Sequence, residues 1–474
     1  MTQLQDDLDS AIRQLRGTVT GPVVCPGEDG YEDECAGTQT AWGHRPVVAV
    51  GARAAADVRA AVSFAAERGL PVAVQATGHG QPESGAGGVL ISTRRMAEVS
   101  VDPARGTAWI GAGTRWREVI DAAAPHGLAP LSGSTSHVGA VSYTLGGGIG
   151  LLARRYGYAV DQVRTIDVVT ADGMARRCTP DTEPDLFWAL CGGRGNFGVV
   201  TALEVGLVPA ARLYGGGLYF DAAHAPAVLA AWLRLTRAAP DELTTSLMII
   251  PFPDLPDVPE PFRGKRIVHV RVAYLGDAAV GDRLVGQLRA VVPPLVEQLA
   301  DIPFTDCDTI HRDPTDPHAF LGTSVFLRDL DEAALAALLD ATGPAAPAVC
   351  LLELRHLGGA LANRGTNAVG FREAGYLLGV VSPLDNVDLS VAERGLETAV
   401  EAVRPWILGR HLNGLFGAAA TPDQVSAAFE PADYRRLAEL KARYDTENLF
   451  RHNHNIPPAR GTVRWFVGGA GDHG

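Results

Sequence analysis

The sequence predicts an α+β fold divided into two or three domains. Its 474 residues exceed the roughly 250 to 300 residues at which a single hydrophobic core stops growing. Up to about residue 209, strand-like and helix-like segments alternate; beyond it, strand-like runs dominate and are separated by helical stretches rich in alanine and leucine. We therefore predict one domain at 1–209, a second at 210–410, and a C-terminal segment, 411–474, that returns to the first domain.

The first domain begins with a strand–helix–strand pattern. After the strand-like run RPVVAVG, residues 55–68 are expected to form a helix that ends at Gly69. One face of this helix carries a stripe of small and aliphatic side chains: Val58, Ala61, Val62 and Ala65. Two short strands follow, PVAVQA and VLIS, with the glycine-rich turn TGHGQPESGAGG between them. A further strand, TAWIGAG, leads into an amphipathic helix that ends at Gly127.

The rest of the first domain holds a glycine-rich segment and a hairpin. Residues 131–163 are rich in glycine and hydroxylated residues, so we expect an extended loop broken by short turns. The run TIDVVTADGMARRC predicts a hairpin with Asp172 and Gly173 at its turn. A short amphipathic helix, PDLFWAL, and a strand, VVTALEVGLVP, complete the domain.

The second domain is expected to be a mostly antiparallel sheet with helices on one side. Its strand-like runs are LYGGGLYF, SLMIIPF, IVHVRVAYLG, AVCLLELRHLGG and AGYLLGVV. Helical stretches cover residues 222–238 and 279–299. The last segment, YRRLAELKARYDTENLFRHNHNIPP, predicts a helix followed by a stretch that is too polar to be simple core.

The composition excludes several classes of function. A formal net charge of -13 argues against binding to nucleic acid and would repel an anionic membrane surface. No apolar run approaches the roughly 18 residues of a membrane span, and the N-terminal sequence lacks the pattern of a signal peptide. The six cysteines do not have the spacing of metal ligands. We therefore expect a cytoplasmic protein without a metal site, whose partner is a small molecule.

One glycine motif formally matches a nicotinamide-dinucleotide fingerprint. Gly148, Gly150 and Ala153 have the required spacing, with Asp172 about 20 residues further on. However, the segment that would form the crossover helix contains Gly157 and follows no clean buried strand. This context argues against a nicotinamide-binding domain.

The alternative is that three glycine-rich loops converge on one phosphate-bearing cofactor and present backbone N–H groups to it. These loops are residues 76–80, 132–150 and 192–198. With these loops, the ordered motifs of the chain resemble the berberine-bridge-enzyme-like FAD-linked oxidoreductases, which have a PCMH-type FAD-binding domain and belong to the vanillyl-alcohol-oxidase-like superfamily. The motifs are PGEDGYEDECAG, RPVVAVG, LPVAVQATGHG, VDPARGTAWIGAGTRWREV, HGLAPLSGSTSHVGAVSYTLGGGIGLLARRYGYAVDQV, VVTADG, DLFWALCGGRGNFGVVTALEVGLVP and RLAELKARYDTENLFRHNHNIPP. The resemblance implies a two-part FAD-binding domain and a substrate domain whose antiparallel sheet is flanked by helices.

The resemblance also implies that FAD is held covalently. In this family the histidine of the T-G-H turn is bonded to the 8α carbon of the flavin, and here that residue is His79. An imidazole suits this role because it is neutral near physiological pH and can act as a nucleophile. Many relatives add a second bond from a cysteine in a G-x-C-x-x-V-G stretch, but Thr135 stands at that position here. We therefore expect a single covalent bond.

Further cofactor contacts follow from the same resemblance. Residues expected around the pyrophosphate are Gly78, His79, Gly80, Ser134, Gly139, Gly147, Gly148 and Gly150. Thr77 and Thr135 are also expected to contact the cofactor. The adenine side would be near Gly198, Val199 and Val200. Asn453 and Asn455 could bond the pyrimidine edge of the flavin or simply cap a loop, and His137, beside Thr135, is either a flavin-edge contact or a loop residue.

The chemistry implied by the family is hydride transfer from a substrate C–H bond to flavin N5, with molecular oxygen as the common acceptor. Many members take a base from the second tyrosine of a Y-x-N-Y stretch, which aligns here with HLNG, so Gly414 cannot supply it. Our candidates for the catalytic role are Glu353, Tyr376 and His411. Glu353 and Arg355 share one strand face, where partial burial could raise the pKa of Glu353, or the two could form a structural ion pair.

The expected substrate is a small organic molecule: an alcohol, an amine, a sugar or an intermediate of secondary metabolism. Two alternatives remain open. The chain could be a flavin dehydrogenase with another electron acceptor, or a protein that binds FAD without turnover, which the glycine at position 414 would favour. The oligomeric state is left open.

Overall fold

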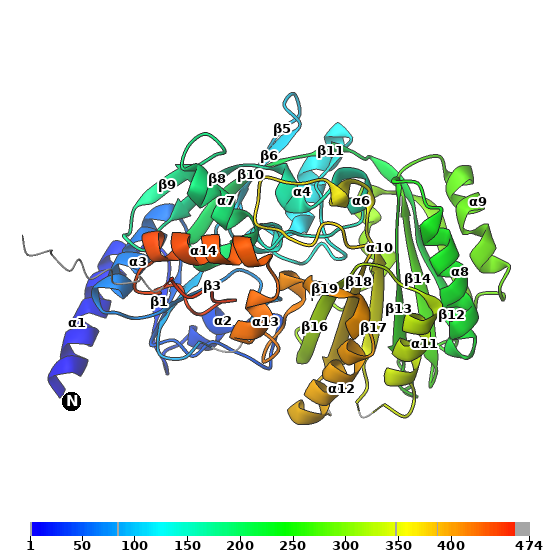
Figure 1. The fold of residues 1–474 in the computed structure, drawn as a ribbon. Coiled ribbons are helices and arrows are strands. Elements are labelled where there is room, and N and C mark those ends of the chain that lie inside the picture. Colours follow the sequence, from blue (N-terminus) through cyan, green and yellow to red (C-terminus); the bar gives the residue numbers. More distant parts are fainter. Residues whose placement is uncertain (1, 83–84, 347, 386, 460–474) are drawn as a thin grey trace, which may run out of the picture.

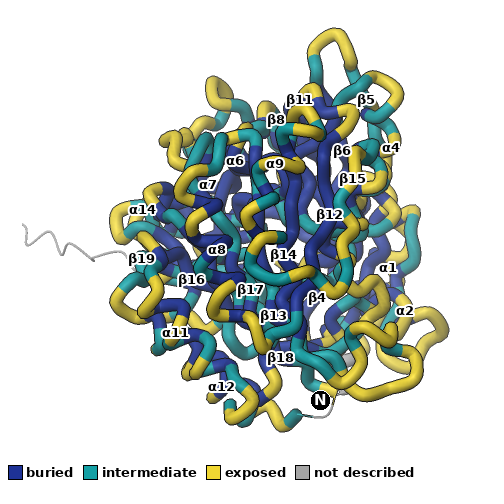
Figure 2. The backbone as a smooth tube through the Cα atoms, turned by 90° about the vertical axis from the view of Figure 1, so that its right-hand side faces the viewer, coloured by how far each residue is buried: buried dark blue, intermediate teal, exposed yellow. Residues whose placement is uncertain are grey.

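The computed structural model describes residues 2–82, 85–346, 348–385 and 387–459 (Figure 1). Helices combine with mostly antiparallel sheets of four, five and eight strands, which confirms the predicted α+β class. Figure 2 shows that the buried backbone is concentrated in the interior, while exposed residues lie in the peripheral loops. No helix in the described ranges is both long and apolar enough to traverse a lipid bilayer.

The first sheet has four strands, in the spatial order β1 (Val23–Val24), β2 (Val48–Gly51), β4 (Val89–Ser92) and β3 (Val72–Gln75). Strand β4 runs parallel to both β2 and β3. Helix α3 (Ala55–Glu67) connects β2 to β3, and its predicted apolar stripe is completely buried. Gly69 follows the helix at a φ of 62°, a left-handed conformation that favours glycine. Helices α1 (Thr2–Thr18) and α2 (Tyr31–Cys35) complete this part.

The second sheet is antiparallel, in the order β5 (Val99–Asp102), β6 (Thr107–Gly111), β10 (Val199–Gly206), β8 (Val163–Val169) and β9 (Ala175–Cys178). The predicted hairpin is confirmed as β8 and β9, with Gly173 at a φ of 72° in its turn. Helices α4 (Trp116–Ala123) and α7 (Pro184–Gly193) pack beside the sheet, and β7 (Leu128–Ala129) pairs with β11 (Val208–Pro209).

The glycine-rich segment 131–163 is more structured than predicted. It contains the short helices α5 (Ala140–Leu145) and α6 (Ala153–Tyr156). These turns form because Val141, Leu145 and Ala153 are buried in the same core as the second sheet. The glycines between them occupy positions where the chain reverses.

The third sheet has eight antiparallel strands, in the order β15 (Val296–Pro303), β12 (Arg212–Asp221), β14 (Arg266–Tyr274), β13 (Leu243–Pro251), β17 (Leu351–His356), β18 (Tyr376–Pro383), β16 (Phe320–Leu327) and β19 (Ile407–Arg410). One face packs against α8 (Ala225–Arg237), α9 (Ala278–Arg289), α11 (Glu332–Ala341) and α12 (Leu389–Glu401) in a single apolar core (Figure 1). Leu352, Leu354, Leu378 and Val380 supply the strand side of that core. The other face looks toward the first two sheets.

One predicted helix is wrong in its C-terminal part. The stretch 279–299 was expected to be helical throughout, but α9 ends at Arg289 and residues 296–303 form the edge strand β15. Pro293 and Pro294 separate the two elements. Consecutive prolines cannot continue a helix because they lack the N–H donor and clash with the preceding turn.

The C-terminal segment lies against the N-terminal half of the chain. Helix α14 (Pro431–Tyr444) crosses over α7, and the irregular stretch after it runs beside β3, where the backbone N–H of Val72 donates to Leu449 O at 2.8 Å (Figure 1). The Nζ atom of Lys441 donates to Asn196 O, across the boundary between the two segments. The part of this predicted segment from 460 to 474 lies outside the described residues.

The remaining helices are short. They are α10 (Asp308–His311), α13 (Pro422–Ser426) and the 3-10 helices η1 (Ala124–His126), η2 (Ala159–Gln162), η3 (Arg194–Asn196), η4 (Ala222–His224), η5 (Phe304–Asp306), η6 (Gly359–Ala362), η7 (Arg404–Trp406) and η8 (Leu412–Gly414). Helix α10 contributes Asp308, which bonds Ser136 and Arg117 and so ties the eight-stranded sheet to the first half.

Candidate functional site

Two cavities of similar size adjoin each other between the sheets. The first, here called the N-terminal cavity, has about 960 Å³ of empty space and is lined by the loop after β3, by α5, by residues 194–200 and by the C-terminal stretch 450–454. The second, the sheet cavity, has about 950 Å³ and lies against β16, β17 and β18. Four residues line both: His79, Gly80, Ser142 and Arg194. The cavities therefore meet at His79.

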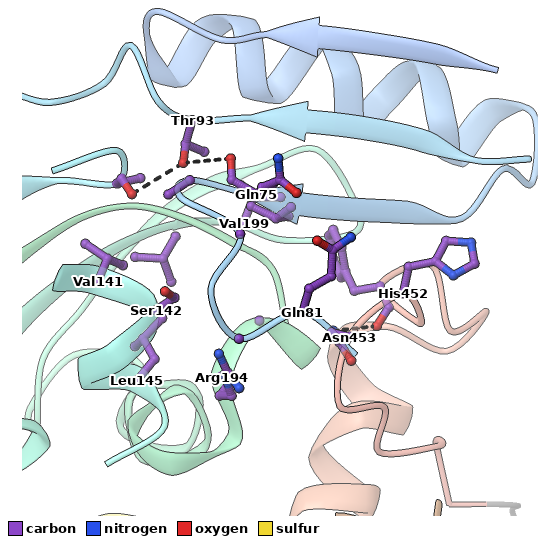
Figure 3. Close-up of a pocket in the computed structure, with 18 of the residues that line it drawn as sticks. Gln75, Gln81, Thr93, Val141, Ser142, Leu145, Arg194, Val199, His452 and Asn453 are labelled. Atoms are coloured by element: carbon purple, nitrogen blue, oxygen red, sulfur yellow. Dashed lines mark hydrogen bonds between the residues drawn. The ribbon is translucent and has the colours of Figure 1, made fainter. Parts of the chain in front are cut away.

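The N-terminal cavity contains buried polar atoms that lack a partner among the described residues. They are Nδ1 of His44, Oε1 of Gln75, Nε2 of Gln81, Nε2 of His452 and Oδ1 of Asn453 (Figure 3). A buried polar group left unpaired costs about 1 to 3 kcal/mol, so such groups usually meet a ligand or water. Both donors and acceptors are present in this set, which fits a cofactor such as FAD that offers both along its length.

His79 is held in place by the loop on which it lies. Its Nδ1 atom is 2.8 Å from Thr77 Oγ1, and the same hydroxyl accepts a hydrogen bond from the backbone N–H of Gly139 at 3.3 Å. Burial, followed by the charges of Arg115 and His137, lowers the pKa of His79 to about 4. The imidazole is therefore neutral at physiological pH and keeps one ring nitrogen with a free lone pair.

Arg194 is a second residue at the junction, and sequence reasoning missed it. It lies between Ser142 and Leu145 on one side and Gln81 on the other (Figure 3). Its backbone has a φ of 56° and a ψ of -145°, a combination that non-glycine residues rarely adopt and that costs roughly 1 to 3 kcal/mol. Backbone strain of this kind clusters at functional sites. The one signal in the sequence was an arginine inside the loop CGGRGNFG.

The guanidinium of Arg194 has no acidic partner among the described residues. Its Nη1 donates to Nδ1 of His454 at 3.0 Å, and Nε2 of that histidine donates in turn to Leu415 O at 2.8 Å. Because arginine only donates, this chain of bonds assigns the proton of the histidine to Nε2. Burial lowers the pKa of Arg194 to about 10, so the side chain still carries its charge at neutral pH.

Only part of the predicted cofactor set lines the N-terminal cavity. The residues that do are Thr77, Gly78, His79, Gly80, Gly198, Val199, Val200 and Asn453. Ser134 instead lines the sheet cavity, and with Gly150 it also lines a smaller cavity of about 410 Å³ behind that one. Residues that line neither of the two main cavities are Thr135, His137, Gly139, Gly147, Gly148 and Asn455. A Cβ added to Gly147 would lie 3.3 Å from Val369, and one added to Gly148 would lie 2.5 Å from the ring of Tyr143, so neither position has room for a side chain.

The alternation of side chains along β17 and β18 decides which candidates face the sheet cavity. Glu353 and Arg355 of β17 face the sheet cavity, as do Leu377 and Gly379 of β18. Tyr376 lies on the opposite, helix-covered face, where its hydroxyl is 2.7 Å from Thr236 Oγ1. Its candidacy as a base is therefore corrected: it does not reach the cavity.

Glu353 is ion-paired on both of its oxygens. Oε1 accepts from Nη1 of Arg271 at 2.7 Å, and Oε2 accepts from Nε of Arg355 at 2.9 Å. Burial by itself would raise the pKa of Glu353, but the two guanidinium groups outweigh it and lower that pKa below its ordinary value. The expected raised pKa is thus wrong, and the alternative of a structural ion pair is what the structure has.

His411 and Gly414 occupy the far wall of the sheet cavity. The Nδ1 atom of His411 is 3.4 Å from Ser324 Oγ, and its Nε2 atom is buried without a partner among the described residues. Burial, followed by the charges of Arg355 and Arg194, lowers the pKa of His411 to about 3. A Cβ added to Gly414 would lie 1.9 Å from Ser324 Oγ, so this position has no room for a tyrosine.

Tyr143 is a further polar residue of the sheet cavity that sequence reasoning missed. It lies on α5, its hydroxyl is buried without a partner among the described residues, and burial raises its pKa well above the ordinary value. Its carbonyl oxygen accepts from Nδ2 of Asn413 at 2.9 Å, which links α5 to η8. No local sequence signal distinguishes this tyrosine from a core tyrosine.

Comparison with known proteins agrees with these cavities. Residues 46–179 match the family model described as FAD binding domain, and residues 416–457 match the model described as berberine and berberine like. The chain is similar to (R)-6-hydroxynicotine oxidase from Paenarthrobacter nicotinovorans, with 28% identity over 93% of this chain and 97% of that protein.

Solved structures share the fold. A BBE-like protein of Physcomitrella patens superposes with a TM-score of 0.83 at 18% identity, over 95% of this chain and 100% of the other. A chitooligosaccharide oxidase superposes with a TM-score of 0.81 at 20% identity, over 96% and 100%. Together, the two matched models and the relative that spans the chain show an FAD-linked oxidoreductase with an FAD-binding domain and a berberine-like domain, and the solved structures show the shared fold.

Proposed function

We propose that this protein is an FAD-dependent oxidase that takes a hydride from a small organic substrate in the sheet cavity and holds its FAD by one covalent bond through His79. The observation that carries the proposal is the meeting of two cavities at that histidine. When bound, FAD supplies the hydride acceptor. The N-terminal cavity would hold its polar body, and the sheet cavity would hold the substrate next to its reactive ring.

The covalent bond rests on the state of His79. A neutral imidazole with its Nδ1 side oriented by Thr77 presents a lone pair without first losing a proton. Neither main cavity has a cysteine among its described lining residues, and Thr135 stands outside both linings. These facts support one bond rather than two.

The side chains of the sheet cavity favour a substrate that needs no strong base. Glu353 is neutralised by two arginines, His411 has a pKa of about 3, and Gly414 offers no ionisable group. A general base works best when its pKa is near the operating pH. An amine suits such a site, because its own nitrogen lone pair can assist the departure of the hydride from the neighbouring carbon. Among the substrate classes above, we therefore favour amines.

The test of the cofactor begins with the purified protein. We expect a yellow protein that keeps its colour in the pellet after acid precipitation, and a His79→Ala variant whose flavin is released into the supernatant. The matched control is His126→Ala, which removes an exposed histidine at the end of η1, far from both linings. Acid-stable flavin in the His79 variant would assign the bond to another residue.

The test of turnover is oxygen uptake with production of hydrogen peroxide, over a panel of amines, alcohols and sugars. Reduction of an artificial acceptor without oxygen uptake would identify a dehydrogenase instead. Silence with every substrate and acceptor would leave a flavin-binding protein without turnover. These measurements identify the electron acceptor, and the cytoplasmic location is a separate prediction.

A further inference from the structure

The sheet cavity carries net positive charge within a protein whose net charge is -13. Its described charged lining residues are Arg194, Arg355 and Glu353. Both histidines of the lining, His79 and His411, are neutral at physiological pH because burial lowers the pKa of each, to about 4 and about 3. Buried charge that is not balanced by the protein is costly, so a site of this kind is expected to take up an anion.

Three strands of the sheet bring most of the charged groups of the cavity together. Arg271 on β14 and Arg355 on β17 both lie opposite Ser246 of the intervening strand β13, so two guanidinium groups occupy one row across the sheet. Glu353 pairs with both of them. Arg355 therefore shares its hydrogen-bonded carboxylate, Glu353, with Arg271. Asp313 is 3.9 Å from Arg271, and its charge also acts on Arg355. The two carboxylates balance these two arginines, so the net positive charge is that of Arg194, which has no acidic partner among the described residues.

Arg355 has hydrogen-bonding capacity left over. Its Nε donates to Glu353, and its Nη1 donates to Ile149 O at 3.2 Å. Its Nη2 has no acceptor among the described residues. The side chain lines the sheet cavity and also the smaller cavity behind it, so this free end is reachable from the substrate space.

A second unused donor lies beside it. The hydroxyl of Tyr143 has no partner in the described part of the chain, and a Cβ on Gly150 would be only 3.3 Å from it. Ile149, the residue before that glycine, is the one that Arg355 bonds. The hydroxyl and the guanidinium thus converge on the same turn of the chain.

We propose that the substrate of this enzyme carries a carboxylate group, which pairs with the free end of Arg355 and accepts a hydrogen bond from the hydroxyl of Tyr143. The inference rests on the proposed function, in which the sheet cavity is the substrate site. A carboxylate suits the site better than a phosphate, because Arg194, Arg271 and Arg355 against the carboxylates of Glu353 and Asp313 leave one positive charge, which a monoanion balances. Such a group also fixes the orientation of the substrate relative to His79.

The test uses the flavin-loaded protein and four unreactive or slowly reacting probes of one shape: benzoate, benzamide, phenyl phosphate and benzylamine. Binding is measured by isothermal calorimetry and by the change in flavin absorbance. We expect benzoate to bind at least about tenfold more tightly than benzamide and more tightly than the other two. Equal binding of benzoate and benzamide, tighter binding of phenyl phosphate or benzylamine, or no binding of benzoate would each overturn the proposal.

Variants of Arg355 and Tyr143 test whether these residues contact the carboxylate of the probe. Arg355→Gln should weaken benzoate by about tenfold or more and leave benzamide nearly unchanged, and Arg355→Lys should recover part of the loss. Tyr143→Phe changes no charge and should weaken benzoate severalfold, which keeps the proposal testable if the arginine variants fold poorly. Arg212→Gln is the matched control, since this exposed arginine of β12 lies three strands from β17 and pairs with Asp301 of the edge strand β15. Benzoate affinity that is insensitive to both Arg355→Gln and Tyr143→Phe would refute the assignment.

The two proposals can fail separately. The visible flavin spectrum and its resistance to acid report on the cofactor, whatever ligand binds. A protein that holds flavin and oxidises neutral or cationic substrates without favouring carboxylates would refute this inference alone. A protein that binds benzoate through Arg355 but contains no flavin would refute the proposed function and leave the anion site in place.

Discussion

Lys441 offers a quantitative test of how the C-terminal segment is attached. It lies on α14 with 0% of its side chain exposed, and its partner Asp445, one turn later, has 1% exposed. The Nζ atom donates to Asp445 at 2.7 Å, to Asn196 O at 2.6 Å and to Phe450 O at 3.2 Å. All three protons of the ammonium group are thus used within the interior.

Replacement of Lys441 by methionine keeps the length of the side chain and removes its charge. Asp445 would then be a buried carboxylate held only by the backbone N–H groups of Leu449 and Phe450. Removing one partner of a buried ion pair costs about 3 to 5 kcal/mol, because the other charge stays buried without compensation. We expect the Lys441→Met variant to lose that much free energy of unfolding.

The assay is urea-induced unfolding followed by tryptophan fluorescence, with the midpoint and slope compared between variants. The double variant Lys441→Met, Asp445→Asn should recover part of the loss, since no charge is left unpaired. The control is Arg404→Met, which breaks the exposed pair with Glu401 and should change stability by less than about 1 kcal/mol. A Lys441→Met protein as stable as the control would refute the reasoning. Because residues 450 to 454 line the N-terminal cavity, the same variant should also retain less flavin.

Three further predictions concern the site. Arg194→Gln should lower the midpoint potential of the bound flavin by about 30 mV or more, because the positive charge at the junction of the two cavities is lost. For a two-electron couple, about 30 mV corresponds to about 1.4 kcal/mol. An unchanged potential in a dye-equilibration titration would place the guanidinium away from the flavin. Tyr376→Phe should keep the wild-type kcat and cost about 1 kcal/mol of stability, because only the bond to Thr236 disappears; a large loss of kcat in steady-state assays would return this tyrosine to the candidates. Finally, stability should fall as the pH drops from about 6.5 toward about 4, measured by thermal unfolding across pH. Burial lowers the pKa of several histidines in the folded protein to between about 3 and about 4, whereas their pKa in the unfolded chain is about 6.5. Between these values the unfolded state binds more protons than the folded state, which favours unfolding. The histidines are His44, His79, His356, His411 and His454. A flat profile from pH 7 to pH 4.5 would contradict their neutral burial.

Local patterns were enough to predict much of the fold. The stripe on α3 and the Asp172–Gly173 turn depend on side chains that are close in sequence, and both are present as predicted. The loop around His79 is equally local: its glycines allow the chain to turn tightly, and Thr77, two residues before the histidine, orients the imidazole. The helix predicted over residues 279–299 was too long, because the prediction ignored the two consecutive prolines that follow the end of α9.

Residues whose role depends on distant partners could not be predicted in this way. The Glu353–Arg355 pair was recognised as a possible ion pair, but its low basicity depends also on Arg271, which reaches it from two strands away. Tyr376 was misplaced because adjoining residues of a strand point to opposite faces, and only the packing of α8 decides which face is covered.

The amino-acid sequence by itself determined the α+β class, because it follows from short-range periodicity and turn chemistry, and its ordered motifs carried the family resemblance that made His79 the attachment candidate. The tertiary structure alone decided that Arg194 and Tyr143 belong to the site and that the sheet cavity is positively charged. The physical reason is that burial and charge balance are sums over groups brought together by the fold from segments far apart in the chain, and no local pattern contains that sum.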